Sequence, residues 1–325
     1  MCTAISCHFG AHYFGRNLDL ECSYGEEIVI TPRGYQFSYR CVKSPQASYA
    51  MVGMALVQEN IPLYFDAMNE CGLCMAGLNF PGNAVYLAKI PGMDNIAPFE
   101  LIPWVLSQCK TLAEVRSLSG SLNLADISFS AELPNSPLHF MVSDQTGSLV
   151  IEPMQKGICV YENPVGVLTN NPPFPFHLQN LNLYMGLSAA TPQNCFSKRL
   201  DLKADSRGMG AIGLPGDLSS ASRFVRAAFC KENSVLEDER EETAVSQFFH
   251  ILGAVYQLSG CNLVADRSYE YTRYSSCCNT EKGIYYYTTY RNSHITKIDL
   301  FRENLNTSCL IRYPKIETGA FYEQN

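Results

Sequence analysis

The first third of the chain contains six strand-like segments with no helix between them. They are short, rich in β-branched and aromatic residues, and separated by Gly, Pro or Asn, as strands usually are. These segments are residues 3–8, 12–20, 26–31, 49–57, 62–68 and 73–80. Strands that follow one another without an intervening helix predict antiparallel pairing.

Helices and strands alternate in blocks along the rest of the chain. One helix is predicted to begin at Pro98 and Glu100, and a second at a capping box formed by Thr111 and Glu114. The remaining predicted elements are helices near 174–187, 220–231 (capped by Ser219 or Ser220) and 240–259, and strands near 137–143, 148–153, 158–162, 269–277, 283–290 and 295–300. This order predicts an α+β fold: a four-layer αββα sandwich of two stacked antiparallel sheets with helices on both outer faces. No repeat or linker is visible, so residues 1–325 are predicted to form one domain.

Composition excludes several classes of protein. With 325 residues, 46% of them hydrophobic, the chain can bury a sizeable core. A formal net charge of −7 argues against nucleic-acid binding, which needs a clustered basic face. No apolar run approaches the length of a membrane span, and no charged start followed by an apolar stretch marks a signal peptide. A cytoplasmic protein with no membrane partner is therefore predicted.

The chain has 14 cysteines, which raises the question of disulfides or a metal. In a reducing compartment most of them are expected to act as small buried apolar residues. Cys71 and Cys74 have two-residue spacing, but no second such pair exists and no histidine pair follows at zinc-finger spacing. The six histidines are scattered. No metal and no organic cofactor is therefore expected.

The first two residues, Met1-Cys2, carry the chemistry of greatest interest. Removal of Met1 would leave a chain whose first residue holds both a thiol and a free α-amine. Such an amine titrates at about 7.7–8.0, so part of it is unprotonated at neutral pH and can accept the thiol proton. Arg16 supplies a cation nearby in sequence that can favour the thiolate. Many chains begin with Met-Cys, however, so this start needs support from the rest of the sequence.

That support comes from motifs spread along the chain. They are Met1-Cys2-Thr3, Phe14-Gly15-Arg16-Asn17-Leu18-Asp19, Asn69-Glu70-Cys71-Gly72-Leu73 with Ala76-Gly77-Leu78-Asn79-Phe80-Pro81, Gly166-Val167-Leu168-Thr169-Asn170-Asn171-Pro172, Leu214-Pro215-Gly216-Asp217 with Ser222-Arg223-Phe224, and Glu281-Lys282-Gly283-Ile284-Tyr285-Tyr286-Tyr287. Through them the sequence resembles the choloylglycine hydrolases, the family of N-terminal-nucleophile hydrolases that contains bile salt hydrolases and penicillin V acylases. The resemblance covers essentially the whole chain.

The resemblance implies a set of catalytic roles. Cys2 would be the nucleophile, Arg16 would stabilise its thiolate, Asp19 would orient the α-amine, Asn79 would donate to the oxyanion, Asn170 would support the same site, and Arg223 would belong to the network. The residues alone leave other interpretations open. Arg16 and Asp19 could form a surface ion pair, and Asn170 lies in a sequence typical of turns. Because residues three apart on a regular strand face opposite ways, the strand is expected to bend or end between Arg16 and Asp19 if both serve one site.

Other positions bear on the substrate. Bile salt hydrolases typically have asparagine at the position of Asn79, where penicillin V acylases often have tyrosine, so the resemblance favours bile salts. A rigid apolar steroid with an anionic tail calls for an apolar pocket with a cation at its mouth. Candidates to line that pocket, or simply to pack in the core, are Tyr24, Ile61, Phe65 and the stretch from Phe129 to Leu138.

A loop triplet bears on the leaving group. In the family a Ser-Arg-x triplet is associated with taurine preference, and Ser206-Arg207-Gly208 matches it. Arg207 could pair with a sulfonate, or it could be an ordinary solvated arginine. Gly208-Met209-Gly210 overlaps that triplet and matches the Gly-x-Gly pattern associated with glycine preference, so a shift of one or two residues would reverse the prediction.

The sequence thus predicts a cysteine N-terminal amidohydrolase that cleaves taurine- or glycine-conjugated bile acids. An acyl-enzyme could also pass its acyl group to amines. Two alternatives are a penicillin V acylase and, from another class, a non-catalytic bile acid or steroid binder in which Cys2 is inert. The family resemblance implies a homotetramer.

Overall fold

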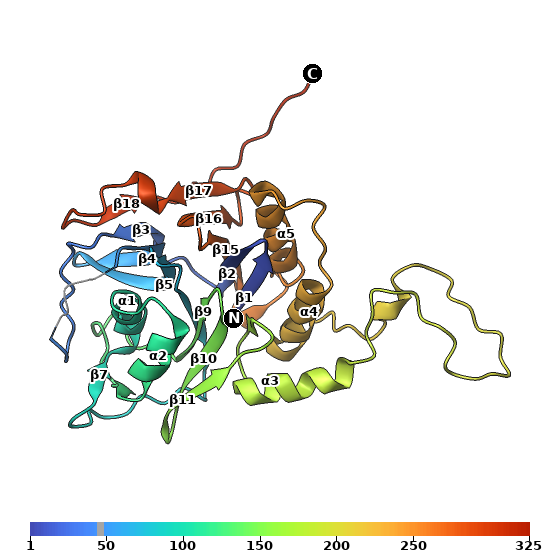
Figure 1. Cartoon of the computed structure of the whole chain (residues 1–325), viewed down its shortest axis with the longest axis horizontal. Coiled ribbons are helices and arrows are strands. Elements are labelled where there is room, and N and C mark those ends of the chain that lie inside the picture. The colour runs from blue at the N-terminus through green and yellow to red at the C-terminus, as the bar shows by residue number, and fades with distance from the viewer. Residues whose placement is uncertain (44–48) are drawn as a thin grey trace.

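The computed structural model of the chain describes residues 1–43 and 49–325. Two large sheets lie face to face, and helices cover the outer face of each (Figure 1). Every strand pair within these two sheets is antiparallel. The predicted four-layer sandwich is therefore confirmed.

The first sheet carries the N-terminus on β1, the strand next to one edge. Its six strands have the order β12-β1-β2-β15-β16-β17. Their bounds are β1 (Cys2–Phe9), β2 (Ala11–Leu20), β12 (Val167–Leu168), β15 (Tyr271–Asn279), β16 (Ile284–Thr289) and β17 (Thr296–Asp299). β1 pairs on one side with β2, which follows it directly, and on the other side with β12, which comes from a distant part of the chain.

The second sheet has eight strands in the order β11-β10-β9-β6-β5-β4-β3-β18. Their bounds are β3 (Glu27–Thr31), β4 (Met51–Gln58), β5 (Ile61–Asn69), β6 (Cys74–Asn79), β9 (Leu138–Asp144), β10 (Gly147–Met154), β11 (Gly157–Glu162) and β18 (Ile311–Tyr313). Two small sheets join β7 (Asp94–Ile96) to β8 (Leu122–Leu124) and β13 (Leu263–Ala265) to β14 (Ser268–Tyr269).

The helices divide between the two outer faces. Against the second sheet lie η1 (Pro98–Glu100), α1 (Leu101–Leu106) and α2 (Leu112–Ser119), and on the side of the first sheet lie α3 (Phe174–Leu181), α4 (Ser220–Glu232) and α5 (Glu241–Gly253). The Thr111 hydroxyl caps α2 by accepting from the amide of Glu114, which is one half of the predicted capping box; the Glu114 carboxylate accepts from the amide of Lys110 instead of that of Thr111. Ser219 is the cap of α4. Apolar clusters fill the space between the sheets and the space beneath α1 and α2.

Two predicted helices end earlier than expected. The segment after α3 continues only as the short helix η2 (Asn182–Tyr184), and α5 ends at Gly253 instead of near 259. Beyond α5, the Gln257 amide donates to the Thr272 hydroxyl at 2.9 Å, which draws this segment toward β15. The strands β7, β8, β12, β13, β14 and β18 were not predicted, because each has only two or three residues.

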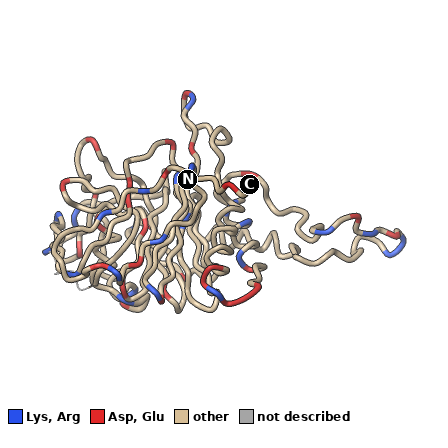
Figure 2. Tube along the Cα trace, turned by 90° about the horizontal axis from the view of Figure 1, so that it is seen from above, with Lys and Arg blue, Asp and Glu red and all other residues tan. Residues whose placement is uncertain are grey.

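An arm leaves the body of the molecule between η2 and α4, where it runs far from both sheets (Figure 1). The amide of Ser188 donates to the carbonyl of Gly210 at 2.9 Å and closes the base of the arm. Basic and acidic residues are interspersed along the trace, including the arm (Figure 2). Among the described residues, no helix combines the length and the apolar character needed to cross a bilayer.

Candidate active site

Cys2 lies at the start of β1, where the strand pairing fixes its neighbours. It pairs with Leu18 of β2 and is 2% exposed. On the other side, Ala4 pairs with Leu168 at the end of β12. Because β12 runs antiparallel to β1, the residues that follow Leu168 pass beside Cys2.

Asn170 is the residue that this pairing brings to Cys2. Its side-chain oxygen accepts from the Cys2 amide at 2.9 Å, and its side-chain nitrogen donates to the Asn79 carbonyl at 2.6 Å. Its own amide donates to the Ser220 hydroxyl at 2.8 Å, and its carbonyl accepts from Nε2 of His177 at 3.0 Å. Asn170 therefore connects β1 in one sheet to the end of β6 in the other.

Arg223 on α4 holds the same corner from the outer layer. Its guanidinium donates to the Cys2 carbonyl, the Thr3 hydroxyl and the Asn170 side-chain oxygen, each at 2.6 Å. It is fully buried, and burial lowers its pKa while the negative groups Asp19 and Cys2 oppose that change. A cation near the N-terminus of a helix is not favoured by the helix dipole, so these acceptors account for its position.

Arg16 lies on the inner face of β2 and is also fully buried. Its Nη1 donates to the Phe65 carbonyl at 3.0 Å and the Gly77 carbonyl at 2.5 Å, whereas its buried Nη2 has no hydrogen-bond partner among the described residues. Burial acts to lower the pKa of Arg16, but Cys2 and other nearby groups outweigh it and raise the pKa. Arg16 is thus a permanent cation with a donor left for a ligand or for the Cys2 sulfur.

Asp19 faces the other side of β2. β2 does not end between Arg16 and Asp19 but continues as one strand from Ala11 to Leu20. The irregularity at this point lies in the pairing with β15, whose register shifts between Thr272, opposite Asp19, and Tyr274, opposite Leu18. The Asp19 carboxylate accepts from the Thr272 hydroxyl at 2.7 Å and from the Gln257 side chain at 2.9 Å.

The terminal amine of Met1 contacts the backbone of Asp19 and not its carboxylate. The terminal amine of Met1 donates to the Asp19 carbonyl at 3.0 Å and forms an ion pair with Glu270. Burial lowers the pKa of this amine. Asp19 therefore lies beside the chain terminus, with its carboxylate held by Thr272 and Gln257.

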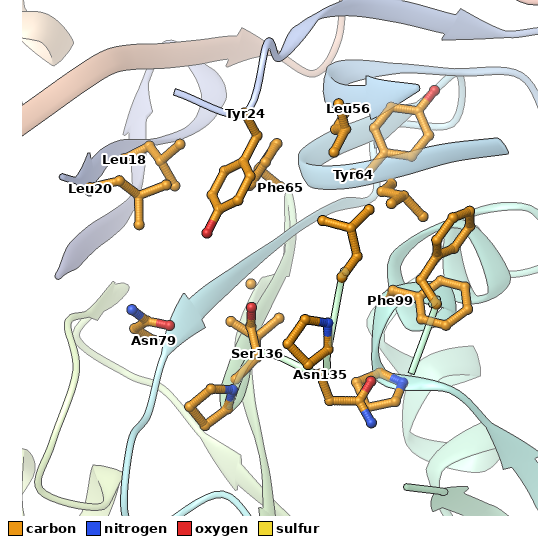
Figure 3. A pocket seen from close by; sticks show the side chains of 18 of the residues that line it. Leu18, Leu20, Tyr24, Leu56, Tyr64, Phe65, Asn79, Phe99, Asn135 and Ser136 are labelled. Atoms are coloured by element: carbon orange, nitrogen blue, oxygen red, sulfur yellow. The ribbon is translucent and has the colours of Figure 1, made fainter. Parts of the chain in front are cut away.

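A cavity of about 380 Å³ opens beside Cys2. Figure 3 shows side chains that line it, among them Tyr24, Phe65 and Asn79. Most of its lining is apolar, and Arg16 and Asn79 line it together with Cys2. Of the residues predicted to contact substrate, Tyr24, Phe65 and eight of the ten residues from Phe129 to Leu138 line it, whereas Ile61, Ser206 and Arg207 are not among its lining residues. A hydrophobic cavity with a nucleophile and polar groups at one end suits a largely apolar substrate with one reactive bond.

The charges around the cavity differ from the expected pattern. A cation was expected at its mouth, but Arg16 is the only Lys or Arg among the lining residues of the described chain, and it is buried. Glu21 and Glu132 contribute two carboxylates to the lining. The cation that this chain supplies therefore serves the reactive end of the cavity.

Sequence reasoning missed the groups that support these residues. The most notable is Asp66, a 1% exposed acid on β5 that lies behind Arg16. An acid flanked by Phe65 and Ala67 in an otherwise apolar strand was the one signal in the sequence. Across the described residues, no group of three or more His, Cys, Asp or Glu side chains is arranged to hold a metal ion.

Two stacked antiparallel sheets with outer helices and a thiol at the first residue of β1, an interior strand, define an N-terminal-nucleophile hydrolase. The chain belongs to the choloylglycine hydrolase family of linear amide C–N hydrolases, whose profile matches residues 2–313.

The relatives agree with this assignment. The chain is 53% identical over 325 residues, all of both chains, to the bile salt hydrolase/transferase of Lactiplantibacillus plantarum. It is 37% identical to a mutant conjugated bile acid hydrolase from Clostridium perfringens, whose crystal structure matches all of both chains with a TM-score of 0.93. Penicillin V acylase from Agrobacterium tumefaciens shares the fold, with a TM-score of 0.77 at 19% identity over 98% of this chain and 95% of its own.

Proposed function

We propose that this protein is a cytoplasmic bile salt hydrolase that cleaves the amide bond of taurine- or glycine-conjugated bile acids. The observation that carries the proposal is the position of Cys2, which opens onto an apolar cavity beside a buried guanidinium and two asparagines. The full-length similarity to the bile salt hydrolase/transferase of L. plantarum supports the choice of substrate.

The proposed reaction uses the chain without Met1. The Cys2 sulfur attacks the amide carbonyl carbon, and the α-amine takes the thiol proton and passes it to the leaving nitrogen. Taurine or glycine departs with its amine restored, and the bile acyl group remains as a thioester on Cys2. Water then attacks the thioester as the amine takes one of its protons, and the amine passes that proton to the sulfur as the free bile acid leaves.

The neighbouring residues each have a proposed part in this reaction. Asn79 donates to the oxyanion that forms on the carbonyl, and Asn170 keeps Asn79 and the α-amine in place. Arg16 stabilises the thiolate, and Arg223 holds the Cys2 backbone. Asp19, whose carboxylate lies near the chain terminus and acts to raise the pKa of the amine there, is proposed to orient the α-amine of Cys2 once Met1 is removed.

A second proposed activity is transfer of the acyl group to amines. A thioester reacts with an unprotonated amine as it does with water, and the L. plantarum relative is named a hydrolase/transferase. Incubation of the enzyme with conjugated bile acid and an excess of another amino acid should then give new amides by mass spectrometry. The Cys2→Ser variant should give none.

The leaving-group preference is proposed to depend on a homotetramer. Ser206 and Arg207 lie on the projecting arm, between η2 and α4, and do not line the cavity of their own chain. A taurine preference set by Arg207 therefore requires an assembly in which the arm of one copy reaches the cavity of another. The glycines that follow have structural reasons of their own: Gly208 has a φ of +81°, and a Cβ on Gly210 would lie 2.1 Å from the Ala190 carbonyl oxygen.

The proposed function is tested with the Cys2→Ser variant on taurocholate, glycocholate and phenoxymethylpenicillin. We expect the variant to lose turnover while its circular dichroism spectrum stays unchanged, because a hydroxyl is a much weaker nucleophile than a thiolate. Cys71→Ser, at an exposed cysteine, is the matched control and should keep full activity.

Three results would count against the proposal. Full activity in Cys2→Ser would exclude the mechanism, and faster cleavage of the penicillin would favour the acylase alternative. An intact mass that retains Met1 would remove the proposed base and favour a non-catalytic binder.

A further inference from the structure

A buried carboxylate lies behind the catalytic arginine and has no part in the mechanism above. Asp66 on β5 projects from the second sheet toward the first, where three hydroxyls donate to it. They belong to Tyr285 at 2.8 Å, Ser276 at 3.0 Å and Tyr274. Isolated buried carboxylates are costly, so a carboxylate supplied with three donors is a built feature of the interior.

A β-bulge brings Asp66 to this position. Met54 pairs with Asp66 but Ala55 pairs with Tyr64, so Phe65 is an extra residue in β5. As a result Phe65 and Asp66, although adjacent in sequence, both lie on the side of the inner sheet interface, while Tyr64 belongs to the cluster on the opposite face. The bulge thus serves two purposes, because the Phe65 ring lines the cavity and the Asp66 carboxylate lies behind it.

The same bulge receives the Arg16 guanidinium. The pairing of β5 with β6 stops at Asp66 and Ala76. The next carbonyl on each strand, from Phe65 and from Gly77, accepts from Nη1 of Arg16 in place of a ladder hydrogen bond. A second connection runs through Ser276, whose hydroxyl accepts from the Arg16 amide at 3.2 Å and donates to Asp66.

Asp66 is also a countercharge for Arg16. It is one of the groups that favour the charged form of Arg16, and Arg16 in turn opposes the rise in the Asp66 pKa that burial causes. The other titratable or charged groups that face this network are Cys2 from β1, Asp19 from β2, Glu26 ahead of β3, Cys74 from β6, Tyr274, Cys277 and Cys278 from β15, Tyr285 from β16, Arg223 from α4 and the terminal amine. Among the acids of this set, Asp66 alone combines hydroxyl donors from the first sheet with a bond, through Ser276, to the backbone of Arg16.

We propose that Asp66 is a positioning residue of the reaction: it fixes the bulge that holds Arg16, and its negative charge limits how strongly Arg16 favours the Cys2 thiolate. This inference rests on the proposed function only for the role of Cys2 as nucleophile. A thiolate made too stable is a weaker nucleophile, so the balance between Arg16 and Asp66 sets the pH at which Cys2 is both ionised and reactive.

The test is the pH dependence of Cys2 alkylation by iodoacetamide, followed by mass spectrometry of the N-terminal peptide. In Asp66→Asn the guanidinium loses its countercharge, so the midpoint of alkylation should move to lower pH by about one unit. The acidic limb of kcat/KM for taurocholate should move in the same direction. An unchanged or higher midpoint would overturn the proposal.

Two tyrosine variants test the proposal even if Asp66→Asn does not fold. Tyr285→Phe removes one donor to Asp66, which makes the carboxylate easier to protonate, so the midpoint should fall by a smaller amount. Tyr287→Phe is the matched control, because this buried tyrosine on the same strand bonds the Ile316 amide and not Asp66. The alkylation midpoint of Tyr287→Phe should equal that of the unsubstituted chain. If Tyr285→Phe also had this midpoint, the result would contradict the proposal.

Alkylation needs no bile salt, so the two ideas fail separately. A chain that does not cleave bile salts but shows the midpoint shift would disprove the proposed substrate and keep the role of Asp66. Normal cleavage of bile salts without a shift of the alkylation midpoint would disprove the role of Asp66 and keep the proposed substrate.

Discussion

At the scale of single residues, Arg223 makes the most demanding set of contacts in the site. One guanidinium serves the Cys2 carbonyl, the Thr3 hydroxyl and the Asn170 side chain. Lysine would keep the charge but lack the rigid fork, so it cannot satisfy these acceptors together. We expect Arg223→Lys to lower kcat/KM for taurocholate by about a hundredfold, comparable to the loss of one oxyanion donor, and to lower the Tm.

Arg226→Lys is the control for that substitution. Arg226 lies on the same helix, where it donates to the Gly216 carbonyl at 3.0 Å and does not contact Cys2 or Asn170. It should keep kcat/KM within about twofold, since no contact of the site is lost. Equal losses in the two variants would mean that Arg223 acts only through the stability of α4.

His12 predicts how stability depends on pH. Burial lowers its pKa from 6.5 to about 3, and the neutral ring bonds the hydroxyls of Ser6, Ser143 and Thr280. Below about pH 6.5 the unfolded chain therefore binds a proton at His12 more readily than the folded chain does. As the pH is lowered from there, the free energy of unfolding falls by up to about 1.4 kcal/mol per pH unit until the pKa of the folded state is reached.

Urea unfolding at pH 6.5 and 4.5 measures this effect. His12→Gln should lose less stability over that interval than the unsubstituted chain, by about 2 kcal/mol. His250→Gln, at an exposed histidine on α5, should behave like the unsubstituted chain. The same loss in His12→Gln as in the other two chains would disprove the prediction.

At the scale of elements, the C-terminal segment supports the loop that carries Tyr24. After β18 pairs with β3, the Lys315 ammonium reaches the Glu26 carboxylate at 2.5 Å, and both side chains are buried. Glu26 also accepts from the Ser23 hydroxyl and the Tyr24 amide. Burial acts to raise the pKa of Glu26, but Lys315 and its other donors hold the pKa below its usual value.

Loss of this ion pair should loosen one wall of the cavity. Lys315→Met leaves the Glu26 carboxylate buried without its partner, so we expect a several-fold rise in KM for taurocholate with kcat nearly unchanged, since Cys2 is not on the loop. Arg312→Met, which breaks the exposed pair with Glu27, is the control and should leave KM unchanged. A fall in kcat without a change in KM would show that the loop acts on the chemistry instead.

The same elements explain how far the sequence could be interpreted. The long strands were predictable because their composition and the turns between them are local signals. The two-residue strand β12 forms only because β1 lies beside it, and the bulge at Phe65 depends on how β5 pairs with β4. Asn170 was therefore found through family motifs, whereas Asp66 needed the pairing of the sheets, which no local pattern encodes.

At the scale of the whole molecule, the two sheets contribute different residues to the site. The first sheet supplies Cys2 and Arg16, and the second supplies Asn79 and part of the cavity wall, the rest of which comes mostly from segments between the strands. Asn170 and Arg223 connect them from a loop and an outer helix. A site built at the junction of layers depends on their packing, so its geometry is a property of the whole sandwich.

The projecting arm is the part of the molecule that this sandwich leaves without a partner. Its apolar side chains are exposed, with Phe196 at 84%, Leu202 at 50% and Leu200 at 48%. Apolar surface of this kind marks an interaction site, and in the proposed homotetramer another copy covers it. Serine at all three positions should therefore reduce the assembly from four chains to one in light scattering.

Loss of the assembly should also alter substrate preference, because Arg207 lies on the same arm and is absent from the cavity of its own chain. We expect the ratio of kcat/KM for taurocholate over glycocholate to fall several-fold in the triple variant and equally in Arg207→Ala, which should stay assembled. Val235→Ser, at an 83% exposed residue outside the arm, should change neither mass nor ratio. If the triple variant were a single chain and kept its preference for taurocholate, Arg207 would have no part in substrate recognition, because no second copy could bring its Arg207 to the cavity.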